Sequence, residues 1–108
     1  MAEFLFKLSS AERKIFEIIS GEAIALGSPA YAVGGYVRDK LIGRPSKDID
    51  IVCVGDAIRL ASAVASRFRP IPQVNYFSRF GTAMIRHHDL EIEFVGARKE
   101  SYVEDSRK

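Results

Sequence analysis

Residues 48–54, which read DIDIVCV, dictate more about the fold than any other segment of the chain. Polar and apolar side chains alternate at the start of this run, and its last four residues are all apolar. This pattern is expected of a central strand with one functional end. Because 108 residues suffice for one hydrophobic core, this run is predicted to be a central strand of a single domain.

Helical periodicity and turn residues place the other elements. Ser9 and Glu12 have capping-box spacing, and apolar residues then recur at helical intervals until Gly27. Pro70 ends a later helix rich in small residues. The predicted elements are helices over 9–27, 36–41 and 55–68, strands over 31–33 and 48–54, and short strands between 74 and 95 with bends at 80–81 and 88–89. This order predicts an α/β (α+β) domain with a small, mixed, largely antiparallel sheet and flanking helices.

Composition excludes several classes of protein. Apolar residues make up 47% of the chain and charged residues 28%, as in ordinary soluble domains. No run approaches the roughly 20 apolar residues of a membrane helix, and the apolar patch at 4–6 lacks the basic leader of a signal peptide. The single cysteine, Cys53, predicts a buried, inert thiol and a reducing, cytoplasmic setting. A net charge of +2 does not by itself indicate a nucleic-acid-binding protein, although basic residues are concentrated in the second half of the sequence.

Asp48 and Asp50 are the first candidates for chemistry. Strand alternation sends both carboxylates to one face and Ile49 to the other. Neighbouring carboxylates repel each other unless a cation lies between them, and their hard oxygens suit Mg²⁺. The alternative for this pair is a solvated strand end.

Gly34 and Gly35 follow a predicted buried strand and precede a helix. Glycines in this position let backbone N–H groups approach a phosphate closely. Arg38, one turn into the helix, could extend such a site as a phosphate-binding fork. The alternatives are a plain strand-to-helix turn and an Asp39 that pairs with Arg38 or a loop group for structural reasons.

The combination of these motifs resembles the N-terminal head domain of class II CCA-adding tRNA nucleotidyltransferases and bacterial poly(A) polymerases. The similarity extends from about Tyr31 to the last residue. The segments that carry it are GGYVRD at 34–39, Leu41 and Gly43, KDID at 47–50, FGTA at 80–83, LEIEF at 90–94 with Arg98, and DSR at 105–107.

The resemblance implies a polymerase-β-like nucleotidyltransferase that adds nucleotides from CTP or ATP to RNA 3′ ends, with the tRNA CCA end preferred over poly(A). It implies that Asp48 and Asp50 hold two Mg²⁺ ions, that Gly34 and Gly35 bind the triphosphate, and that Arg38 contacts the nucleotide. In a two-metal mechanism one ion activates the attacking 3′ hydroxyl and the other stabilises the leaving pyrophosphate.

A third carboxylate is expected on a neighbouring strand, and Glu93 is the candidate. Leu90, Ile92 and Phe94 should face inward, which leaves Glu91 and Glu93 together on the opposite face. The alternative is that both glutamates simply face solvent. His87 and His88 are predicted to be exposed turn residues rather than metal ligands, and the phenylalanines and Tyr76 to be core residues rather than base-stacking platforms.

Residues 98–108 carry charges of both signs and few apolar anchors, which is typical of a linker. We therefore expect residues 1–108 to be a head domain truncated from a longer chain with helical neck, body and tail domains. Such a head should bind Mg²⁺ and a triphosphate weakly and have little or no tailing activity. Two other classes stay open: a non-catalytic nucleotide-binding or interaction module, and a small nucleotidyltransferase acting on a protein or small molecule. The sequence leaves the oligomeric state unknown.

Overall fold

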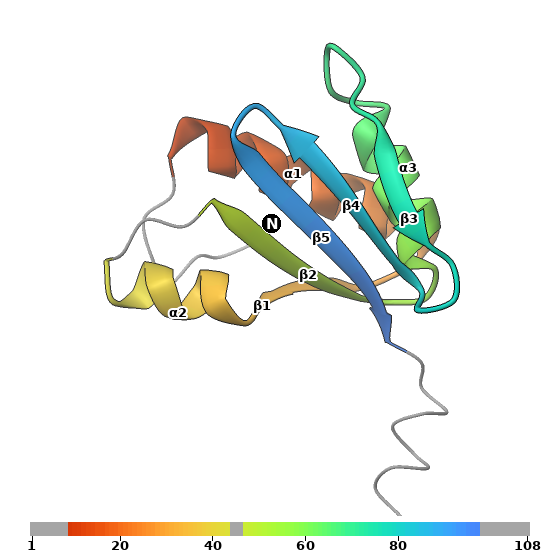
Figure 1. Cartoon of the computed structure of the whole chain (residues 1–108), viewed down its shortest axis with the longest axis horizontal. Helices are drawn as coiled ribbons and strands as arrows, with labels where there is room; N and C mark the ends of the chain where they lie inside the picture. Colours follow the sequence, from red (N-terminus) through yellow and green to blue (C-terminus); the bar gives the residue numbers. More distant parts are fainter. Residues whose placement is uncertain (1–8, 44–46, 98–108) are drawn as a thin grey trace, which may run out of the picture.

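A computed structural model of the chain describes residues 9–43 and 47–97. Its elements are α1 (Ser10–Leu26), β1 (Ala30–Val33), α2 (Gly35–Leu41), β2 (Asp48–Val54), α3 (Ala57–Ala65), β3 (Val74–Phe77), β4 (Thr82–His87) and β5 (Leu90–Ala97) (Figure 1). The predicted order of helices and strands is confirmed. The apolar patch at 4–6, the loop residues 44–46 and the charged stretch 98–108 lie outside the described residues.

Local chemistry explains where the helices begin and end. The Ser9 hydroxyl accepts a hydrogen bond from the Glu12 N–H at the start of α1, and Gly27 ends the helix in the left-handed conformation. The Asp56 carboxylate caps α3 by accepting from the Arg59 N–H. α3 is shorter at both ends than the predicted 55–68. None of the helices in the described part of the chain is long and apolar enough to cross a membrane.

The strands form one sheet in the order β1-β2-β5-β4-β3. β2 and β5 are parallel, and the other three pairings are antiparallel, so the prediction of a mixed, largely antiparallel sheet is confirmed. β2 has a neighbour on each side, as expected of a central strand. Its partner β5 comes from the far end of the described chain.

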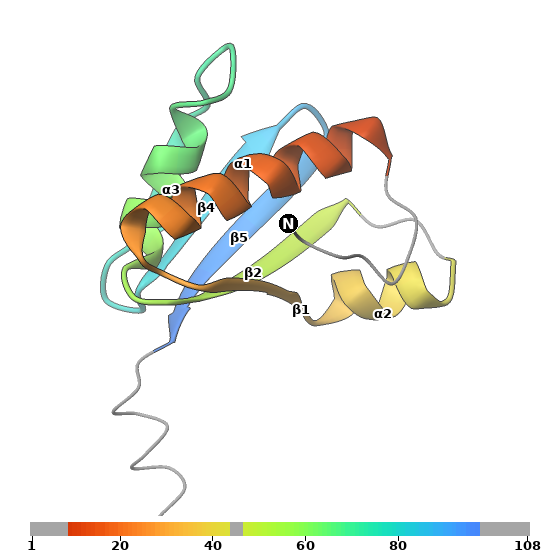
Figure 2. The same ribbon diagram turned by 180° about the vertical axis from the view of Figure 1, so that it is seen from behind.

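Helices α1 and α3 pack on one face of this sheet, and no described helix covers the other face (Figures 1 and 2). The core therefore lies between these two helices and the sheet. β2 contributes Ile49, Ile51 and Cys53 to it, and β5 contributes Ile92 and Phe94; all five are essentially inaccessible to solvent. Burying each large side chain stabilises the fold by roughly 1.5–3 kcal/mol. The prediction of a buried Cys53 thiol is confirmed.

The hairpin of β3 and β4 corrects one prediction. Tyr76, Phe77 and Phe80 were expected in the core, but they are 61%, 55% and 71% exposed. β3 is an edge strand and Phe80 lies in the turn between β3 and β4, so these rings stand at the margin of the sheet. The prediction holds for Phe68 and Phe94, which are buried.

The two histidines at the end of β4 differ from each other. His88 is exposed and adopts a positive φ of 56° in the turn, as predicted. His87 is half-buried and stacks on Phe68 with ring centroids 4.1 Å apart, so its assignment as an exposed turn residue is wrong. The pleat turns His87 toward the core side of β4, together with Ala83 and Ile85.

Candidate active site

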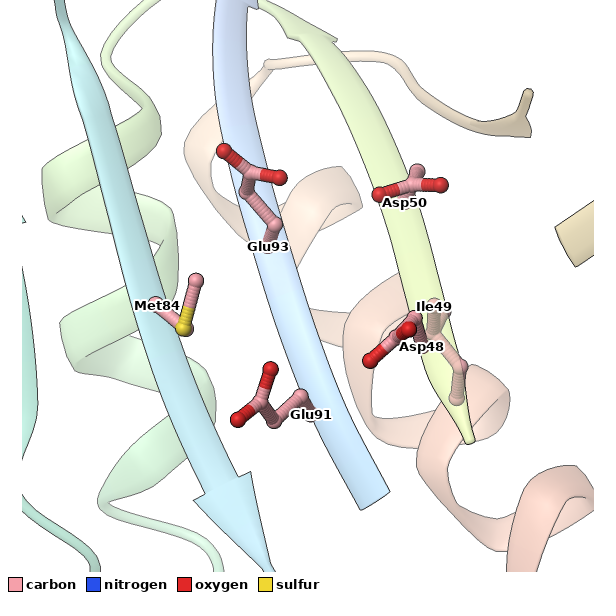
Figure 3. A pocket seen from close by; sticks show the side chains of 6 residues that line it. All are labelled: Asp48, Ile49, Asp50, Met84, Glu91 and Glu93. Carbon is pink, nitrogen blue, oxygen red and sulfur yellow. The ribbon is translucent and has the colours of Figure 1, made fainter. Parts of the chain in front are cut away.

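Four carboxylates stand on the open face of the sheet. Alternation along β2 sends Ile49 into the core and Asp48 and Asp50 to this face, as the sequence predicts. On the adjacent β5, Glu91 lies opposite Asp48 and Glu93 lies opposite Asp50. The pocket that they form is lined by Asp48, Ile49, Asp50, Met84, Glu91 and Glu93 (Figure 3). The parallel pairing of β2 and β5 therefore brings together carboxylates that are about 40 residues apart in the sequence.

The electrostatics of this cluster favour a bound cation. Partial burial, together with the negative charge of Asp48, raises the pKa of the Asp50 carboxyl above its usual range. Glu91 has a counter-charge already, because it forms an ion pair with Arg86 of β4. Within residues 9–43 and 47–97 no three acidic, histidine or cysteine side chains come close enough to form a ligand group. Two carboxylates completed by water and phosphate oxygens are, however, a usual set for Mg²⁺.

The Gly34 turn lies against Asp50. β1 ends at Val33, which pairs with Asp50, and the chain then turns at Gly34 with a φ of 73°. A Cβ at Gly34 would lie 3.3 Å from Oδ2 of Asp50. Both the left-handed backbone and the close carboxylate therefore require glycine here. The candidate phosphate turn and the candidate metal carboxylates thus occupy one place.

Arg38 lies beside the same turn. Its Nη2 is 3.4 Å from where a Cβ on Gly35 would be, and its Nε is 3.5 Å from Oδ1 of Asp39. The Arg38 side chain is mostly exposed, whereas Oδ1 of Asp39 is buried and makes no hydrogen bond to the described residues. Arg38 is thus near the glycines and paired with Asp39, which is one of the two pairings that the sequence left open for Asp39.

Sequence reasoning missed two residues around the site. Met84 of β4 lines the pocket because it stands opposite Glu93 in the antiparallel pairing of β4 and β5. Tyr36, directly after the glycines, is buried and donates a hydrogen bond to Glu12. Capping-box spacing had explained Glu12 only as part of a helix cap.

Comparison with known proteins shows the family of the chain. The model of the poly(A) polymerase head domain family matches residues 30–108, which is most of the chain. The chain belongs to this family. An A-adding tRNA nucleotidyltransferase from Aquifex aeolicus is 45% identical over 73 residues, which cover 68% of this chain and 9% of the relative. The head domain described here thus spans about a tenth of that relative's length.

Two solved structures share the fold. A CCA-adding enzyme in complex with ATP superposes with a TM-score of 0.80 at 26% identity, over 93% of this chain and 24% of its own. A tRNA nucleotidyltransferase bound to a primer tRNA and an incoming ATP analogue gives a TM-score of 0.69 at 41% identity, over 77% of this chain and 24% of its own. The head domain therefore has the polymerase-β-like fold of CCA-adding enzymes, and the family is one of nucleotidyltransferases.

Proposed function

We propose that the protein to which this head domain belongs transfers nucleoside monophosphates from CTP and ATP to RNA 3′ ends, as in CCA addition to tRNA. The observation that carries the proposal is the approach of Gly34 to Asp50, with a potential Cβ only 3.3 Å from the carboxylate. Nucleotidyl transfer requires a triphosphate and metal-binding carboxylates at one place, because catalysis comes mainly from positioning and electrostatics. The ATP and primer-tRNA complexes of the solved relatives support the same substrates.

Two Mg²⁺ ions are the proposed cofactors, with Asp48 and Asp50 as their protein ligands. The donors fit these ions, because they are hard carboxylate oxygens on one open face. When bound, the ions would activate the attacking 3′ hydroxyl and stabilise the leaving pyrophosphate. Glu93 is the proposed third carboxylate, since it stands opposite Asp50 on the neighbouring strand while Glu91 is paired with Arg86.

Gly34 and Gly35 are the proposed triphosphate-binding residues. Without side chains they leave their backbone N–H groups open to donate hydrogen bonds to phosphate oxygens. Arg38 would hold the nucleotide through a charge-assisted contact, since its guanidinium already lies beside Gly35. Asp39 would hold the Arg38 guanidinium near the turn while no nucleotide is bound.

Base choice and RNA binding are proposed to come from elsewhere in a longer protein, whose helical neck, body and tail domains would follow this head. The chain spans 9% of the Aquifex relative and 24% of each solved relative above. We therefore expect the head alone to bind nucleotides weakly and to have little or no tailing activity. The free, buried Cys53 supports a reducing compartment, for which we propose the cytoplasm.

Calorimetric titration with ATP and CTP, with and without Mg²⁺, tests this function. We expect both nucleotides to bind only with Mg²⁺, and binding to disappear in the double variant Asp48→Asn/Asp50→Asn. Glu22→Gln is the control, because it removes a negative charge from α1, on the helical layer of the domain. A folded wild-type chain, and a longer protein containing it, that both fail to bind Mg²⁺ and nucleotide would contradict the proposal.

A further inference from the structure

The carboxylate of Glu12 is buried for a reason that helix capping does not explain. Glu12 is only 5% exposed, although capping-box glutamates need no burial to work. Its Oε1 accepts from the Ser9 N–H at 2.9 Å, which completes the capping box. Its Oε2 accepts from the Tyr36 hydroxyl at 3.0 Å, 24 residues away in the sequence. Burying a carboxylate is costly unless it is well hydrogen-bonded, and the Tyr36 hydroxyl supplies a hydrogen bond that offsets this cost.

Tyr36 is the buried anchor of α2. It is almost completely inaccessible to solvent, and its ring packs against Phe16 with centroids 5.7 Å apart. The helix itself is only seven residues long and ends at an exposed Leu41. Burial and the Glu12 carboxylate raise the pKa of the Tyr36 phenol far above its usual value, so the hydroxyl stays a donor. The hydrogen bond thus ties α2 to α1.

The Gly34–Gly35 turn needs anchors on both sides, because glycine is the most conformationally free residue. On its N-terminal side the pairing of Val33 with Asp50 fixes the chain. On its C-terminal side the next residue is Tyr36. Gly34 is a near neighbour of the Asp50 carboxylate, because a Cβ built on this glycine would lie 3.3 Å from Oδ2 of Asp50.

We propose that the buried hydrogen bond from Tyr36 to Glu12 is a positioning contact that holds the Gly34–Gly35 turn against Asp50 for triphosphate binding. Glu12 and Tyr36 touch no substrate; they act through the turn. The inference rests on the proposed function, since it assigns the turn to the triphosphate. The carboxylates stand on one face of the sheet (Figure 3) and α1 packs on the other (Figure 2), so the proposal adds that α1 takes part in forming the site.

Two variants test the contact. Tyr36→Phe removes only the hydroxyl that donates to Glu12. Glu12→Gln leaves one side-chain oxygen, which can accept from the Ser9 N–H or from the Tyr36 hydroxyl but not from both as the carboxylate does. The control is Ile19→Val, a core change in α1 that reduces stability without touching the contact. Backbone ¹⁵N relaxation of Gly34 and Gly35 in the ligand-free chain measures how rigid the turn is. We expect order parameters near about 0.85 in the wild type and Ile19→Val, and values toward about 0.6 in both test variants.

Mg²⁺-ATP titration gives the second readout. Loss of one hydrogen bond to a charged group should weaken binding about tenfold in each test variant. The double variant should bind no more weakly than the worse single variant, because both remove the same contact. Unchanged order parameters, with binding no weaker than in Ile19→Val, would overturn the positioning role. A wild type that binds no Mg²⁺-ATP would count against the proposed function instead, while the order parameters still decide whether the contact holds the turn.

Discussion

Asp50 of β2 stands directly opposite Glu93 of β5, and both side chains line the same pocket on the open face of the sheet (Figure 3). Like charges in facing positions of neighbouring strands destabilise a sheet. Partial burial of Asp50 adds to this cost, as the raised pKa of its carboxyl indicates. The pair is thus unfavourable for the fold alone and favourable for a cation, which is the pattern expected of a functional site.

Asp50→Asn should therefore stabilise the metal-free domain while it abolishes Mg²⁺ binding. Removing one of two facing charges should add up to about 1 kcal/mol to the free energy of unfolding. Urea denaturation at neutral pH without divalent ions measures this change. Glu22→Gln, which breaks the ion pair of Glu22 with Arg67, should have no effect or a slightly destabilising one. A metal-free Asp50→Asn domain less stable than the wild type would show that the carboxylate is a structural group.

Glu93→Gln and Glu91→Gln separate the third carboxylate from its neighbour. Glu93 faces Asp50, whereas Glu91 faces Asp48 and is neutralised by Arg86. We expect Glu93→Gln to weaken Mg²⁺ binding about tenfold or more, the equivalent of one charge-assisted contact. Glu91→Gln should change it by less than about threefold. Isothermal titration with Mg²⁺ measures both, and a larger loss in Glu91→Gln would reverse the assignment.

His87 should make stability depend on pH. Burial, with the charges of His88 and Lys14, lowers the pKa of His87 below its ordinary value of 6.5. Below pH 6.5 the unfolded chain therefore binds protons that the folded chain does not, so stability should fall as the pH falls. Urea midpoints between about pH 7.5 and about pH 5.5 should show this decline in the wild type.

His87→Phe should flatten the decline, because a phenylalanine can keep the stack on Phe68 and cannot titrate. His88→Asn is the matched control, since asparagine tolerates the positive φ of that turn. This control should retain most of the pH dependence. An undiminished decline in His87→Phe would assign it to other groups.

Much of the fold followed from local sequence signals. The capping box at Ser9 and Glu12 and the glycine at 27 set α1, and alternation in 48–54 set the two faces of β2. These signals act over a few residues, so sequence alone can reveal them. For the same reason, residue type and spacing single out the Asp48 and Asp50 pair and the glycine turn as candidates, whereas their proposed roles came from the combination of motifs and the family resemblance.

Non-local relationships could not be predicted in this way. The pairing of β2 with β5, which sets Glu93 opposite Asp50, depends on strand order rather than on either strand's sequence. The exposed Tyr76 and Phe77 look like core residues until β3 is known to be an edge strand. The burial of Glu12 and its bond to Tyr36 could not be predicted, because the capping box already explained a glutamate at this position. Nothing in the sequence around Tyr36, which follows the glycine turn, indicates that its hydroxyl donates a hydrogen bond to Glu12.

Gly34→Ala and Gly27→Ala form a matched pair that separates backbone strain from damage to the site. Both glycines have a positive φ, 73° at Gly34 and 67° at Gly27, so alanine should cost about 1–2 kcal/mol of stability at either position. Their surroundings differ: a Cβ at Gly34 meets the Asp50 carboxylate at 3.3 Å, whereas a Cβ at Gly27 meets no atom of the described residues within 4 Å.

Urea denaturation and Mg²⁺-ATP calorimetry on the two variants should therefore diverge. Stability should fall by similar amounts, but only Gly34→Ala should weaken nucleotide binding, by about tenfold or more, because its methyl group displaces Asp50 and occupies the turn. Nucleotide binding as strong as in the wild type in both variants would mean that the turn does not receive the triphosphate. Equal loss of binding would instead attribute the effect to general destabilisation, since Gly27 lies at the end of α1 and outside the pocket.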